Sequence, residues 1–98
     1  MYQYRIYVGC NVPNGEPHAP DVVESVGLRR CPFDGCTVQQ HVTGVWKGIR
    51  EKTVVFEYIG IGEAGEYDNA LKWAALLKVD FSQEAVLLTR TLIESFFV

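Results

Sequence analysis

Several common catalytic signatures are missing from this chain of 98 residues. Gly60, Gly62 and Gly65 lack the Lys-Ser/Thr pair of a P-loop and the spacing of a dinucleotide fingerprint, so we expect them to form a mobile loop. The serine, histidine and aspartate residues do not follow an order typical of a hydrolase triad. The sequence therefore predicts that, if the protein is an enzyme, its substrate carries the reactive groups and the protein supplies shape.

Strong charge and long apolar runs are also missing. The formal net charge is −3, so we expect no nucleic-acid partner. No apolar run is long enough to span a bilayer, and the N-terminal residues do not have the layout of a signal peptide. We therefore expect a cytoplasmic protein that does not interact with a membrane.

Cysteine and histidine are sparse. The three cysteines are Cys10, Cys31 and Cys36, and the Cys31-x4-Cys36 spacing fits no common zinc motif. His18 and His41 do not lie at a companion spacing, and His41 alone on a strand is typical of a structural or surface histidine. We expect buried or half-buried thiols and no metal, with a metal site as the minor alternative.

What is present is an apolar pattern, since 48% of the residues are hydrophobic. Alternation with a period of two predicts strands over residues 2–10, 36–46, 51–61 and 83–91. In the second of these, Val38, Gln40, Val42 and Gly44 are expected to share one face. Because the second and third strands are close in sequence, they should form a hairpin. The polar pair Gln83-Glu84 is typical of a strand cap or an edge device.

Two helices complete the prediction. Residues 19–27 begin near Pro20, a favourable first-turn residue, and end at Gly27, a plausible C-terminal stop. Residues 67–79 have the clearest helical spacing of apolar side chains. The order βαββαβ predicts an α+β protein, a single ferredoxin-like sandwich over residues 1–98. The apolar run 92–98 is either an extra C-terminal strand or a segment that packs on a neighbouring subunit.

Three polar side chains are candidate site residues. Glu51 lies between Arg50 and Lys52, either as a solvated charge at a strand end or as a carboxylate in a cleft that binds an ammonium group or orders a water. Strand aromatics are more often core, but Tyr7 and Tyr58 each carry a hydroxyl that needs a partner, which makes them candidate ligand contacts.

Six short segments carry a resemblance to a known family. They are YRIYVGC at 4–10, GCTV at 35–38, TGVW at 43–46, EKTV at 51–54, ALKWA at 70–74 and FSQEAVLL at 81–88. In this order and spacing they resemble the phage-encoded S-adenosylmethionine (SAM) lyases, formerly called SAM hydrolases. The EKTV segment is the most specific of the six. The same strand–helix–strand ending also resembles a family of small uncharacterised bacterial α/β proteins.

The resemblance implies a PII-like homotrimer of ferredoxin-like subunits with active sites between neighbours. It implies conversion of SAM to 5′-methylthioadenosine and homoserine lactone without a cofactor, in the host cytoplasm if the protein is phage-encoded. The key glutamate of the family maps onto Glu51, and we expect Tyr7 or Tyr58 to line the site.

This chemistry agrees with the missing signatures, because the substrate carboxylate can attack its own γ-carbon and expel a neutral thioether. Two alternatives stay open. One is a non-catalytic, trimeric PII-like protein that binds a nucleotide or metabolite, and the other is a structural interaction domain. Lactone formation and direct hydrolysis also remain undistinguished at this point.

Overall fold

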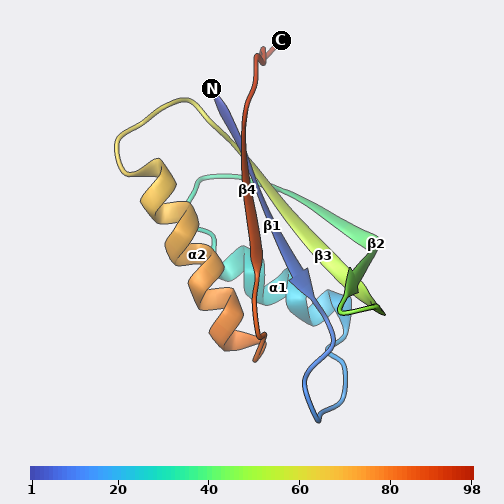
Figure 1. Ribbon diagram of the computed structural model, residues 1–98. Coiled ribbons are helices and arrows are strands. Elements are labelled where there is room, and N and C mark those ends of the chain that lie inside the picture. Colours follow the sequence, from blue (N-terminus) through green and yellow to red (C-terminus); the bar gives the residue numbers. More distant parts are fainter.

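The computed structural model describes residues 1–98, which form four strands and two helices (Figure 1). The elements are β1 (Tyr2–Gly9), α1 (Pro20–Arg30), β2 (Thr37–Trp46), β3 (Ile49–Gly60), α2 (Glu66–Asp80) and β4 (Leu87–Leu92). The sheet order is β2-β3-β1-β4, and each neighbouring pair is antiparallel. The predicted ferredoxin-like α+β fold is therefore confirmed. Neither helix is long and apolar enough to cross a membrane.

Both helices cover the same face of the sheet, and the other face is left open (Figure 1). Because successive strand residues point to opposite faces, Ile6 and Val8 of β1 point to the helices and are almost fully buried. Ile6 pairs with Phe56 of β3, and both belong to the core cluster with Trp73 and Leu77 of α2. The apolar alternation that predicted these strands thus builds the core on the helix face.

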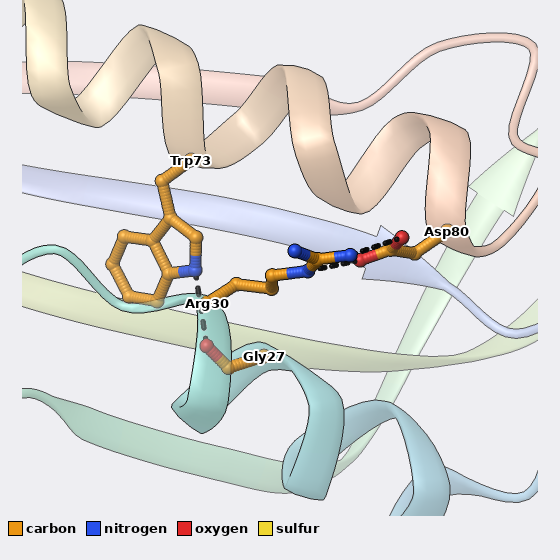
Figure 2. A network of polar contacts seen from close by, with 4 residues as sticks. All are labelled: Gly27, Arg30, Trp73 and Asp80. Atoms are coloured by element: carbon orange, nitrogen blue, oxygen red, sulfur yellow. Dashed lines mark hydrogen bonds and ion pairs between the residues drawn. The ribbon is translucent and has the colours of Figure 1, made fainter.

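The two helices are joined by polar contacts as well as by the core (Figure 2). The buried Trp73 indole N–H donates to the carbonyl of Gly27 over 3.1 Å. Arg30 donates to both carboxylate oxygens of Asp80, at 2.9 and 3.1 Å. Gly27 does not end α1, as the sequence predicted, but lies inside it. A Cβ there would collide with the Phe56 ring, so the glycine allows close packing of helix on sheet.

A β-bulge in β2 changes the predicted faces of that strand. Val38 pairs with Phe56, whereas Val42 pairs with Thr53, so β2 holds one more residue than β3 between these pairs. His41, at the bulge, has a φ of 61° in the left-handed region. An extra residue inverts the alternation. Val38 therefore points to the helix side and Val42 to the open face, and the prediction that they share a face is wrong.

The C-terminal part of the chain contains less strand than the sequence predicted. The last strand begins at Leu87 rather than at residue 83, and residues 83–86 form a connection instead. The possible extra strand over 92–98 is not found, because the residues after Leu92 form no strand. A single bond, from the Ile93 N–H to the Met1 carbonyl at 2.9 Å, continues beyond the β1–β4 ladder.

Candidate active site

A cavity of about 810 Å³ opens on the helix-free face of the sheet, at the end of β1. Its walls come from β1 and the following loop (7, 9 and 11–13), from the β2–β3 hairpin (42–47, 49, 51 and 53) and from residues 83–87. Its size is typical of a small-molecule site, and about half of its lining residues are hydrophobic.

Glu51 is the carboxylate at the inner wall of this cavity. Its Oε2 accepts a hydrogen bond of 3.0 Å from the Asn11 backbone N–H. The carboxylate lies directly on Gly9, where a Cβ would fall 2.5 Å from Oε2 and closer still to the other two carboxylate atoms. Glu51 pairs with Gly44, at which a Cβ would meet the Thr53 hydroxyl at 2.5 Å. The missing side chain at Gly9 thus leaves room for the carboxylate, and the one at Gly44 leaves room for the neighbouring Thr53 hydroxyl.

The two candidate tyrosines lie on different faces of the sheet. Tyr7 lines the cavity, as Glu51 does. Tyr58 lies outside the cavity lining and is stacked on Phe33, with ring centroids 3.7 Å apart and planes 4° apart. Burial, and then the nearby Glu66 carboxylate, raise the pKa of Tyr58. The structure therefore brings Tyr7 and Glu51 together and leaves Tyr58 in the aromatic packing.

Neither Asn11 nor Gln83 was among the candidate site residues predicted from the sequence. The Gln83 side-chain amide donates to the Asn11 carbonyl at 2.8 Å and to the Phe81 carbonyl at 3.1 Å. Asn11 is in a loop and Gln83 lies 72 residues further on, so periodicity does not relate them. In the sequence, Gln83 was noted in the polar pair 83–84, which was interpreted as a strand cap or edge device, and in the FSQEAVLL segment of the family resemblance.

The turn of the β2–β3 hairpin is tied to the 83–87 wall. Glu84 accepts hydrogen bonds from the Trp46 indole N–H at 3.3 Å and from the Lys47 ammonium at 3.1 Å. These contacts, which we call the hairpin latch, join two walls of the cavity. Lys47, and then Trp46, lower the pKa of Glu84 below its ordinary value of 4.5. The latch is exposed, so its contribution to stability should be small.

The thiols agree with the expectation of buried or half-buried cysteines. Cys10 is buried, and Cys31 and Cys36 are half-buried. Burial, and then the Glu51 carboxylate, raise the pKa of the Cys10 thiol, so it remains neutral beside the cavity. Burial and the neighbouring Cys31 raise the pKa of Cys36 to about 11. These are poor conditions for a thiolate nucleophile.

The two histidines are in different environments. His41 is exposed at the bulge, and the Nε2 of His18 is 3.2 Å from the Phe81 carbonyl. No group of three or more His, Cys, Asp or Glu side chains is placed to hold a metal ion.

No protein-family model and no curated protein matches this sequence. The solved structures that are similar to it include two of a phage SAM lyase. One is a phage SAM lyase in the apo state, with a TM-score of 0.70 and 24% identity over 92% of this chain and 78% of that chain. This chain has the fold of a phage SAM lyase. The other is a phage SAM lyase in complex with S-methyl-5′-thioadenosine, with a TM-score of 0.67 and 22% identity over 92% of this chain and 79% of that chain.

Proposed function

We propose that this protein is a SAM lyase that converts SAM to 5′-methylthioadenosine and homoserine lactone. The observation that carries the proposal is the Glu51 carboxylate on the wall of a cavity of about 810 Å³, in a fold shared with a phage SAM lyase that binds the methylthioadenosine product. Glu51 would hold the substrate ammonium group, and Tyr7 would line the site. Tyr58 is assigned to packing because it lies outside the cavity lining.

The proposed reaction needs no nucleophile from the protein. A carboxylate oxygen of the methionine arm forms a bond to its own γ-carbon as the bond from that carbon to sulfur breaks. The bonding electrons leave with sulfur, so a sulfonium becomes a neutral thioether and a carboxylate becomes a neutral ester, with no proton transferred. Alignment of two groups within one molecule can contribute about 7–11 kcal/mol. A folded methionine arm is therefore the main requirement on the protein.

Charge supports SAM as the ligand. The ammonium and sulfonium groups of SAM outnumber its one carboxylate, so the molecule has a net charge of about +1 near neutral pH. In the cavity lining the charged side chains are Glu51, Glu84 and Lys47, and Lys47 is paired with Glu84. The unpaired charge is thus the negative charge of Glu51, which complements the cation. Attack and departure also neutralise opposite charges, a change that apolar walls favour.

We further propose that the active subunit is part of a homotrimer with the cavity at a subunit interface. The support is apolar side chains exposed at the cavity in a single subunit: Val45 is 66% exposed, Ile49 63% and Leu87 59%. A neighbouring subunit would cover them and exclude water from the site. The molar mass in solution, measured by light scattering, tests this assembly; a monomer at active concentrations would contradict it.

The central experiment is incubation of the purified protein with SAM, followed by chromatography for methylthioadenosine and homoserine lactone. Replacement of Glu51 by glutamine keeps its shape and removes its charge, so turnover should fall at least a hundredfold while the fold is retained. Near-normal activity in this variant would remove Glu51 from the mechanism. Stabilisation by SAM without product would instead favour the metabolite-binding alternative. The absence of both product and stabilisation would favour an interaction domain.

Lactone formation and direct hydrolysis can be separated in ¹⁸O-labelled water. Direct hydrolysis puts the label on the γ-hydroxyl oxygen of homoserine. Lactone formation leaves that oxygen unlabelled, because it comes from the substrate carboxylate, and later opening of the ring by water labels the carboxyl group. Fragment masses of homoserine distinguish the two. We expect label in the carboxyl group only.

A further inference from the structure

The backbone at the end of β1 is held at every polar group. The Cys10 N–H donates to the Lys52 carbonyl at 2.8 Å, and the Cys10 carbonyl accepts from the His18 N–H at 2.7 Å. The Asn11 N–H donates to Glu51, and the Asn11 carbonyl accepts from the Gln83 side chain at 2.8 Å. The first two bonds are between backbone groups and do not depend on side chains. The other two bonds each have a side-chain partner, with Glu51 as the acceptor and Gln83 as the donor.

We propose that Gln83 is a positioning residue for the Glu51 carboxylate, acting through Asn11. This inference rests on the function proposed above, in which Glu51 holds the substrate ammonium. Asn11 lies beyond the last residue of β1, and residues 13–17 of its loop are exposed. Without the glutamine, the structure offers no other hydrogen-bond donor to the Asn11 carbonyl. The peptide group between Asn11 and Val12 would then be free to rotate, and the Asn11 N–H would be held only through the Cys10–Asn11 peptide group, whose carbonyl bonds His18. Motion of the exposed loop would then reach Asn11 and weaken its bond to Glu51.

Gln83 is suited to this task because it is itself fixed. The same side-chain nitrogen also donates to the Phe81 carbonyl, and the Phe81 side chain is only 3% exposed. The glutamine backbone N–H donates to the Lys78 carbonyl at the end of α2. Gln83 therefore anchors Asn11 to the packed end of α2, so that the position of Asn11 does not depend on its own loop alone. A glutamine that served only as a strand cap would not contact the cavity loop.

The test is replacement of Gln83 by leucine, which keeps the volume and removes the donor. We expect kcat for SAM to fall tenfold or more. The Kd for methylthioadenosine should stay within twofold of the wild-type value, because this product lacks the methionine arm. Replacement of Gln83 by glutamate, which also removes the amide donor, should act in the same direction if the leucine variant does not fold. The matched control is Gln40→Leu, which removes a hydrogen bond of 3.1 Å to Asp21 away from the cavity and should leave kcat unchanged.

A second measurement does not depend on activity. Hydrogen exchange followed by NMR should become at least tenfold faster at the Asn11 amide in the Gln83 variants, while exchange at the Cys10 amide stays slow. If the wild-type protein does not cleave SAM, the proposed function fails and this measurement still tests the link from Gln83 to Asn11. Unchanged Asn11 exchange, or a fall in kcat matched by equal weakening of methylthioadenosine binding, would overturn the positioning role.

Discussion

A methyl group added at Gly9 should displace the Glu51 carboxylate without disturbing the core. The glycine is not required by its backbone, since its φ lies outside the left-handed region. Its Cβ would fall 2.5 Å from Glu51 Oε2, against 3.4 Å for ordinary van der Waals contact. Gly9 is paired with Thr53 in the β1–β3 ladder and is followed by Cys10, whose backbone N–H and carbonyl are both bonded, so the flexible carboxylate is the group that must move, by about 1 Å.

This displacement sets the size of the expected effects. A shift of about 1 Å in a reacting or binding group can reduce the rate about a hundredfold, which corresponds to about 2.7 kcal/mol in the barrier. Loss of the Asn11–Glu51 hydrogen bond should reduce the free energy of unfolding by only about 1 kcal/mol, or about 4–8 °C in melting temperature for a domain of this size. Gly9→Ala should therefore lose activity far more than stability.

The assay combines SAM turnover with urea unfolding. Gly35→Ala is the matched control, because no atom lies within 4 Å of the Cβ it would add, and it should leave both measurements unchanged. In a Glu51→Gln background, Gly9→Ala should cost little further activity, because the two changes act on the same group. The reasoning is refuted if Gly9→Ala turns over SAM at the normal rate, or if it costs another hundredfold in the Glu51→Gln background.

Three further outcomes are expected. Gly27→Ala forces a methyl group into the Phe56 ring and should lower the free energy of unfolding by about 1–3 kcal/mol, measured in urea. Tyr58→Ala removes a stacked partner of Phe33 and should also reduce stability, yet the Kd for methylthioadenosine should not change; a large loss of binding would return this tyrosine to the site. The pKa of Glu84 is lowered in the folded protein, so its stabilisation of the hairpin latch is present above pH 4.5 and is lost as the pH falls further. The NMR signal of the Trp46 indole N–H, which bonds Glu84, should therefore shift in that acidic range, and Glu84→Gln should abolish the shift.

The elements and their order followed from local signals in the sequence. The alternation of β1 and the helical spacing of α2 reflect burial on one face, so their bounds agree with the structure to within about a residue. Errors arose where tertiary packing overrides local preference. Gly27 resembles a helix stop, but it lies inside α1, in contact with Phe56. The strand expected from residue 83 begins only at Leu87, and the backbone N–H of Gln83 bonds the Lys78 carbonyl at the end of α2 instead of a strand.

The site was only partly visible in the sequence. Glu51 and Tyr7 were singled out from charge, hydroxyl chemistry and family resemblance, and both line the cavity. Tyr58 has the same chemistry, yet the alternation of β3 puts it on the same face as Phe56, among the helix-side aromatics. The bulge near His41 leaves no signal in a period-two pattern, although it decides which β2 residues face the cavity.

The arrangement around Glu51 indicates why this carboxylate should bind a cation rather than transfer protons. Its hydrogen bond in the structure comes from the Asn11 backbone N–H, which can donate but cannot relay a proton. No histidine lines the cavity, and the nearby Cys10 thiol is kept neutral by a raised pKa. A general base acts by removing a proton from the substrate, and the proposed ring closure involves no proton transfer. A fixed anion beside apolar walls meets the needs of a substrate that carries both its nucleophile and its leaving group.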